Sequence, residues 1–227
     1  MTNIQNDNHI QSIFQSSEFN DLNRDDFNKK FINDPNYLQL KQLKEINNEI
    51  LMSCFLTRND LDFRGNKISG WSLNEKRGNT TYEPPIGWIG IGIKVLRVYG
   101  EDDWIQKNSR NEWSVAYHGI TGREVKKIIR LIIKGGFRPG AGQIFKDCED
   151  LLHPGKKVGA GVYFTPTIKV AEEYSAVANF GGEKYKVALM VRVKPEKIRK
   201  CRENESFWVL NGTTDEVRPY RILFKKV

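Results

Sequence analysis

The feature that most constrains the fold is a series of short apolar segments between residues 89 and 227, separated by glycine, proline and polar residues. They are IGIGIKVLRVY (89–99), WSVAYH (113–118), GVYFT (161–165), YKVALMVRVK (185–194), SFWVLN (206–211) and YRILFKKV (220–227). Their length and their β-branched and aromatic content predict strands. Two helix-type segments, 123–134 and 167–178, lie between them. We therefore expect an α+β domain with mostly antiparallel strands and two short helices.

Both helices have recognisable end signals. Thr121 and Glu124 have the spacing of a capping box, which predicts that the first helix begins there. Gly135 is expected to end that helix, because glycine tolerates a left-handed cap. Thr167 is the expected N-cap of the second helix. The first helix should bury the apolar side chains Val125, Ile128, Ile129, Ile132 and Ile133.

The chain is expected to divide near residue 65. Residues 1–65 are mostly polar, and the segment 37–52 has the apolar spacing of one amphipathic helix. We expect a mostly helical N-terminal extension there, and a second domain over 66–227. The segment 63–88 is rich in turn residues and should be irregular.

Charge is unevenly distributed over a chain whose net charge is +8. Residues 1–65 hold seven Lys and Arg against ten Asp and Glu, whereas residues 66–227 hold 29 against 18. A basic domain attracts phosphates, acidic proteins or nucleic acid. Nucleic acid is therefore one candidate partner, and surface lysines that only confer solubility are the simpler explanation of the charge.

Cysteine content and hydropathy bear on the cellular compartment. The three cysteines, Cys54, Cys148 and Cys201, are few, odd in number and far apart, which argues against a disulfide framework and suits a reducing compartment. No apolar run reaches the roughly 18–20 residues of a membrane span. We expect a monomeric intracellular protein, cytoplasmic or nuclear, with no metal site, because convergent Cys and His ligands are lacking.

The segment VGAGVYFTPTIKVAEEY (158–174) places two tyrosines eleven residues apart, one on a strand and one on the following helix. Gly159 and Gly161 leave the backbone open to close approach by a ligand, or serve only a turn that needs positive φ. Tyr163 and Tyr174 could hold a flat heteroaromatic ring between them. They could equally be ordinary core aromatics.

His118 and Gly119 end the strand WSVAYH. An imidazole at a strand end can hydrogen-bond a hydroxyl, and an exposed glycine backbone can pair with a planar carboxamide. A structural histidine is the alternative interpretation.

Together these segments resemble the poly(ADP-ribose) polymerase-like, diphtheria-toxin-type ADP-ribosyltransferases, as a divergent eukaryotic branch. YHGI (117–120) resembles their His-Gly-Thr/Ser motif, GAGVYF (159–164) their Gly-x-Gly-Ile/Val-Tyr-Phe motif, and IKVAEEY (168–174) the helix that carries their second tyrosine. The resemblance covers roughly residues 85–227. It implies the split β-sheet core of that fold, with NAD as substrate and no metal.

The resemblance also implies roles for individual residues. His118 would bind a ribose hydroxyl of NAD, and Gly119 the nicotinamide carboxamide. Tyr163 and Tyr174 would sandwich the nicotinamide ring, with Gly161 beside them. The loop 137–160 would cover the dinucleotide. The implied activity is mono-ADP-ribosylation of a protein acceptor with release of nicotinamide.

The sequence departs from the family at the third catalytic position, which is usually glutamate. The family interval, counted back from Tyr220, falls on Phe207, beside Ser206. A register shift would supply Glu205, and Glu216 is a remoter candidate; both could simply be solvated. Ile120 and Ala171 stand where the family usually has hydroxyl side chains. Two alternatives therefore remain: an inactive module that binds NAD or ADP-ribose, and a transferase that acts on nucleic acid.

Overall fold

The computed structural model describes residues 61–63, 75–122, 124–140, 142–180 and 182–227. The predicted helix 37–52 lies outside the described residues. The described elements are, in chain order, β1 (Leu61–Asp62), β2 (Lys76–Arg77), β3 (Thr80–Thr81), β4 (Ile89–Gly92), β5 (Ser114–Gly119), α5 (Val125–Gly135), β6 (Val162–Phe164), α6 (Ile168–Glu173), β7 (Val177–Phe180), β8 (Glu183–Val193), the 3₁₀ turn η2 (Pro195–Lys197), β9 (Arg199–Cys201), β10 (Asn204–Leu210) and β11 (Val217–Lys226). This mixture, mostly strand with few helices, is compatible with the expected α+β class.

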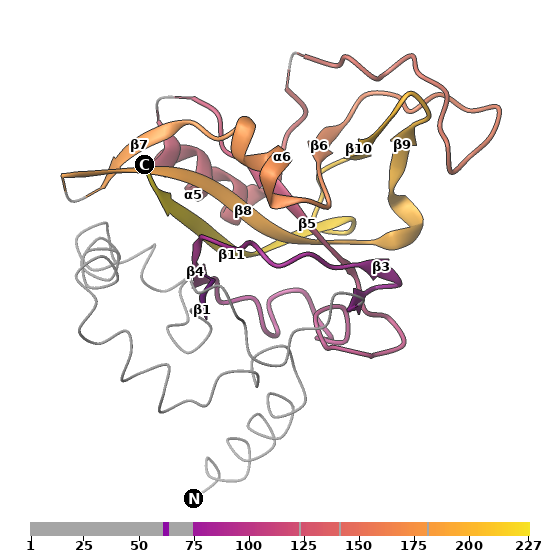
Figure 1. The fold of residues 1–227 in the computed structure, drawn as a ribbon. Helices are drawn as coiled ribbons and strands as arrows, with labels where there is room; N and C mark the ends of the chain where they lie inside the picture. The colour runs from indigo at the N-terminus through magenta and orange to yellow at the C-terminus, as the bar shows by residue number, and fades with distance from the viewer. Residues whose placement is uncertain (1–60, 64–74, 123, 141, 181) are drawn as a thin grey trace, which may run out of the picture.

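Two antiparallel sheets form the body of the described chain (Figure 1). The larger has the order β1-β4-β11-β8-β5, and β7 also pairs with β8. The smaller has the order β6-β10-β9. Every strand pairing in the described ranges is antiparallel. The two sheets meet at an isolated bridge between Tyr117 of β5 and Thr165, the residue after β6.

Strand β8 is the centre of the larger sheet because it is apolar on both faces. Its residues from Val187 to Val193 are buried, and it pairs with β11, β5 and β7. Burial of each large aliphatic side chain contributes about 1.5–3 kcal/mol. Arg192 is the charged exception, and its guanidinium donates to the Glu112 carboxylate at 3.1 Å and to the Trp113 carbonyl at 2.6 Å. A buried charge is tolerated when it is paired in this way.

The larger sheet begins before the boundary predicted at residue 66. β1 pairs with β4 (Leu61 opposite Gly90), and the adjacent Phe63 is buried. The segment expected to be irregular contains the β2–β3 hairpin. Its turn residues Gly78 and Asn79 have φ values of 55° and 65°, which suit a tight hairpin turn.

The predicted capping box is not formed. α5 begins at Val125, after Glu124, and no side chain caps it. Gly122 has a φ of 103°, which is incompatible with a helix that starts at Thr121. At the other end the helix includes Gly135, and Gly136 is the C-cap with a φ of 75°. Val125, Ile129 and Ile132 are buried as expected, whereas Ile128 and Ile133 are only half-buried.

Two predicted elements are shorter than expected because tertiary pairing or a turn intervenes. β4 ends at Gly92, and Arg97 adopts a φ of 59° in the turns that follow. α6 ends at Glu173 with Thr167 as its N-cap, as predicted, although the threonine hydroxyl makes no capping bond. The rest of that predicted helix includes the first two residues of β7, which pairs with β8 as an edge strand. Backbone pairing with β8 therefore outweighs the local helix preference of this segment.

Candidate functional site

The candidate site lies where β5 and β6 separate. Tyr117 and Thr165 exchange backbone hydrogen bonds of 2.8 and 3.0 Å, and Ile120 N–H donates to the Val187 carbonyl on the opposite edge of β5. Successive residues of a strand direct their backbone groups to alternate edges. Gly119 therefore directs its N–H and carbonyl to the same edge as Tyr117, toward β6 and the junction between the sheets.

His118 is connected to the same junction through its side chain. Its Nδ1 lies 2.8 Å from the Tyr163 carbonyl, and its ring contacts Phe137 and Phe164 with centroid separations of 5.1 and 5.3 Å. A carbonyl only accepts, so Nδ1 carries the proton and Nε2 of the neutral ring can accept. Burial lowers the pKa of His118, and the hydrogen bond to Tyr163 opposes this only in part. The imidazole is therefore held in its neutral form.

Tyr163, on β6, is contacted by the long loop between α5 and β6. The Phe145 N–H donates to the Tyr163 hydroxyl at 3.0 Å, and the two rings are 5.7 Å apart. In the same loop, the side-chain carbonyl of Gln143 accepts a hydrogen bond from the Gly161 N–H at 2.8 Å. The loop expected to cover a ligand thus packs beside the first predicted tyrosine.

Tyr174 immediately follows α6 and is 49% exposed. Its ring meets the ring of Phe207 edge-on at 5.6 Å, and the Phe207 ring also lies 6.2 Å from Tyr163. Phe145 joins this group at 5.4 Å from Phe207. We call Phe145, Tyr163, Tyr174 and Phe207 the aromatic group. Both predicted tyrosines therefore contact one shared ring, and His118 is hydrogen-bonded to the backbone of one of them.

The glycines of this region have different roles. A Cβ on Gly119 would lie 2.3 Å from the Ala171 carbonyl oxygen, so its absence lets the end of α6 approach β5. A Cβ on Gly161 would lie 2.7 Å from the Arg199 guanidinium and 2.6 Å from the Leu210 carbonyl. Gly159 has a φ of 74°, which satisfies the alternative that it serves a turn. The space that the missing side chain of Gly161 leaves is thus filled by Arg199 and the Leu210 carbonyl rather than left for a ligand.

Arg199, on β9, fixes the backbone that leads into Tyr163. Its guanidinium donates to the carbonyls of Val158 and Ala160 at 2.5 and 3.2 Å. No sequence motif pointed to this residue. Its partners are about forty positions away in the chain, and only the β9–β10–β6 pairing brings them together.

The residue of β10 whose ring contacts both tyrosines is Phe207. Glu205 lies two positions earlier on the same strand and is exposed. Glu216 accepts hydrogen bonds from the backbone and side chain of Asn211, at 2.9 Å each, and so closes the turn before β11. An acidic group among the aromatic rings is therefore not evident in the described contacts, and the catalytic role of Glu205 stays a prediction.

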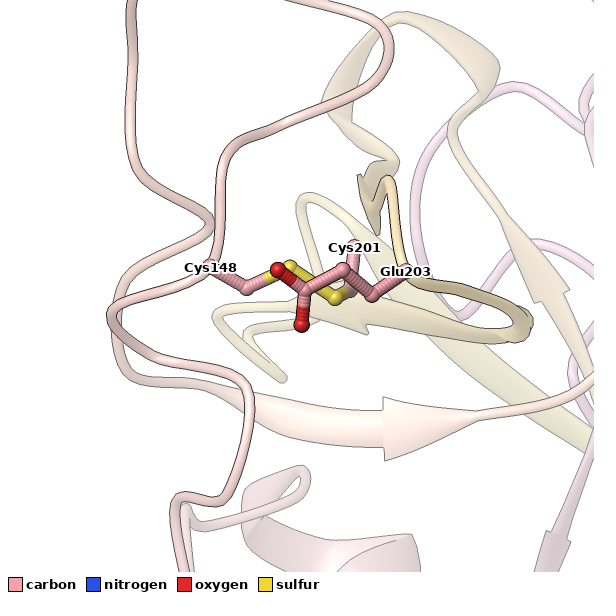
Figure 2. A group of neighbouring side chains, drawn as sticks. All are labelled: Cys148, Cys201 and Glu203. Atoms are coloured by element: carbon pink, nitrogen blue, oxygen red, sulfur yellow. A yellow bond between two sulfur atoms is a disulfide. The ribbon is translucent and has the colours of Figure 1, made fainter.

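The structure contains one disulfide among the described residues, although the cysteine spacing argued against a disulfide framework. Cys148, in the long loop, is bonded to Cys201, the last residue of β9, with a Cα–Cα distance of 5.5 Å. Pairing of the loop with β9 places these distant residues side by side, which sequence spacing cannot reveal. Figure 2 shows Glu203 beside the two sulfur atoms. The bonded sulfurs are not free to act as thiolate ligands for a metal.

Within the described ranges, no helix combines the length and apolarity that crossing a bilayer requires. The sequence matches no protein-family model, and a search of curated proteins finds no match.

Proposed function

We propose that this protein binds NAD at the junction of β5 and β6 and transfers its ADP-ribose to a protein acceptor, releasing nicotinamide. The observation that carries the proposal is the set of contacts that links His118, Tyr163 and Tyr174. The imidazole is bonded to the Tyr163 backbone, and both tyrosine rings contact Phe207. These are the residue types that hold a ribose hydroxyl and a flat pyridine ring in the family that the sequence resembles.

Each group has a chemically suitable role in this proposal. Nε2 of the neutral His118 accepts a hydrogen bond from a ribose hydroxyl. The backbone of Gly119 supplies one donor and one acceptor, which match a carboxamide. The partly exposed ring of Tyr174 and the ring of Tyr163 contact the nicotinamide. Two observations support these roles. The proton on Nδ1 of His118 leaves Nε2 as an acceptor, and the N–H and carbonyl of Gly119 point toward β6.

The proposed reaction breaks the bond between nicotinamide and ribose, and positive charge develops on the sugar. Fixing the NAD conformer and placing the acceptor beside the sugar lowers the barrier without a strong enzyme nucleophile. A carboxylate beside the ribose would stabilise the developing charge further. Glu205 is the proposed carboxylate, and it is exposed on β10 two residues from Phe207.

Phe207 favours one second candidate, an NAD-binding module without turnover. An aromatic ring contacts both tyrosines, and a ring cannot replace a carboxylate electrostatically. The two candidates share the NAD site and differ only in whether the glycosidic bond breaks.

The first experiment measures NAD binding by calorimetry and transfer of radiolabelled ADP-ribose from NAD. Wild-type protein should bind NAD and label a protein acceptor. His118→Ala should weaken binding about tenfold or more, because a hydrogen bond and a buried ring are lost. Glu205→Gln should retain binding and reduce labelling, because it removes charge without changing shape.

Leu131→Ala is the matched control, because Leu131 is 60% exposed on α5 and belongs to none of these groups. It should bind and transfer as the wild type does. Binding without labelling would favour the inactive module, and labelling of an added oligonucleotide in place of protein would redirect the acceptor assignment. Absence of NAD binding would overturn the proposal.

A further inference from the structure

The disulfide joins the loop that contacts the aromatic group to a strand of the smaller sheet. Cys148 lies three residues after Phe145, whose backbone and ring both contact Tyr163. Cys201 lies two residues after Arg199, which holds the backbone before β6. Phe145, Tyr163 and both cysteines pack with Val158 and Val209 in one small apolar cluster. The disulfide is therefore linked to Tyr163 by direct packing contacts.

The two halves of the loop are anchored to different segments. The half that follows Cys148 bonds to β9, with Leu151 N–H donating to the Lys200 carbonyl at 2.8 Å and Arg202 N–H to the Glu149 carbonyl at 3.0 Å. The half that precedes Cys148 contacts the site through Phe145 and Gln143, and its Lys146 carbonyl accepts a hydrogen bond from the Gly159 N–H at 2.8 Å. It also exposes most of its length, including Ile144 with 74% of its surface accessible. Loss of the crosslink should therefore loosen the half that contacts Tyr163.

We propose that the Cys148–Cys201 disulfide is a redox latch that holds Phe145 against Tyr163, so that reduction loosens the loop and weakens ligand binding at the aromatic group. The effect on ligand rests on the proposed NAD site, whereas the effect on the loop does not. A preformed site loses less conformational entropy on binding than a mobile one, which sets the direction of the change.

The chemistry is thiol–disulfide exchange with a dithiol reductant. Cys148 is half-buried and Cys201 is 1% exposed, so the incoming thiolate attacks the sulfur of Cys148. The bond between the two cysteines breaks, and Cys201 leaves as a thiolate that takes up a proton. The second thiol of the reductant then displaces Cys148, which leaves with the second proton, and the reductant becomes a disulfide. Two electrons pass from reductant to protein.

Contacts beside the cysteines favour the return reaction. The side chains of Glu149 and Arg202, each next to one cysteine, form an ion pair at 3.0 Å, and their backbones are hydrogen-bonded. Asp150 also accepts from the Lys200 N–H at 3.2 Å. These contacts do not depend on the disulfide, so the reduced cysteines stay close enough to re-form it.

The test compares air-oxidised full-length protein with protein treated with dithiothreitol. Amide hydrogen exchange is followed at Phe145 and Gly161, and NAD is the binding probe. Reduction should speed exchange at both amides about tenfold, because the opening of that half of the loop costs less free energy. The dissociation constant for NAD should rise about three- to tenfold, because the site is less preorganised.

Cys148→Ser should show the reduced values with or without dithiothreitol. Cys54→Ser is the matched control, since it removes the third cysteine and should keep the full redox response. Unchanged exchange on reduction, or three free thiols in the air-oxidised protein, would overturn the latch. If exchange responds but neither form binds NAD, the latch on the loop is supported and the proposed function fails.

Discussion

At His118, burial and hydrogen bonding act in opposite directions on one imidazole. Burial disfavours the charged ring and lowers its pKa, whereas the bond from Nδ1 to the Tyr163 carbonyl favours protonation in part. The two aromatic rings that contact it, Phe137 and Phe164, carry no charge to stabilise an imidazolium. A neutral ring with a fixed tautomer can accept a hydrogen bond from a hydroxyl and so position it.

The same shift predicts how stability depends on pH. The unfolded chain binds a proton at His118 near the ordinary histidine pKa of 6.5, and the folded chain resists protonation. The free energy of unfolding should therefore be highest above pH 6.5 and fall below it, with a slope of up to about 1.4 kcal/mol per pH unit from this group. Urea titrations of wild type and His118→Asn should show a smaller loss in the variant, because asparagine does not titrate. Equal slopes for both proteins would contradict the assignment.

At the scale of elements, β6 is positioned by its neighbours as much as by its own sequence. β10 pairs with it in register, and β9 brings Arg199 over the turn that precedes it. The glycine at position 161 leaves room for this guanidinium and for the Leu210 carbonyl. In the described structure, Gly159 and Gly161 thus make room for the guanidinium of Arg199.

Gly161→Ala tests this packing. The new Cβ would lie 2.6 Å from the Leu210 carbonyl and 2.7 Å from a Val209 methyl group, so the variant should lose about 1–3 kcal/mol of unfolding free energy. Gly142→Ala, in the same loop, is the control: apart from its chain neighbours, no atom of the described residues lies within 4 Å of its added Cβ, and little change is expected. Chemical denaturation measures both. A Gly161 variant as stable as the Gly142 variant would refute the packing assignment.

At the scale of the whole molecule, the site lies where the larger sheet meets the smaller one, at the Tyr117–Thr165 bridge and the contacts of His118 with Tyr163 and Phe164. The larger sheet supplies His118 and Gly119, and the smaller supplies Tyr163 and Phe207. Segments distant in sequence hold the smaller sheet and its loop together, and the disulfide spans a separation of 53 residues. Its contribution to stability should therefore come largely from constraining the unfolded chain.

Reduction should lower the free energy of unfolding measurably. For a separation of 53 residues the loss of loop-closure constraint corresponds to about 4 kcal/mol. Urea unfolding with and without a reductant measures the difference, and Cys148→Ser should match the reduced protein. Identical midpoints in oxidising and reducing buffer would show that the crosslink does not form in solution.

The apolar segments were sufficient to predict where the six strands β4, β5, β6, β8, β10 and β11 lie, because alternation and β-branched content are local properties. The apolar segments were not sufficient to predict where the helices and strands begin and end. Gly122 shifted the start of α5, and pairing with β8 converted the segment after Tyr174 from predicted helix to strand β7. Helix ends depend on φ angles and on neighbours, which a pattern of apolar residues does not specify.

The sequence by itself determined which residues can carry the proposed chemistry: His118, Gly119, Tyr163 and Tyr174 stand in motifs whose spacing is local. Only the tertiary structure decided what surrounds them. Three contacts join residues far apart in the chain: the ring of Phe207 contacts both tyrosines, Arg199 donates to the backbone before β6, and Cys148 is bonded to Cys201. Such contacts follow from strand register and loop docking, and these are set by the packing of the whole domain, so no single segment contains the information.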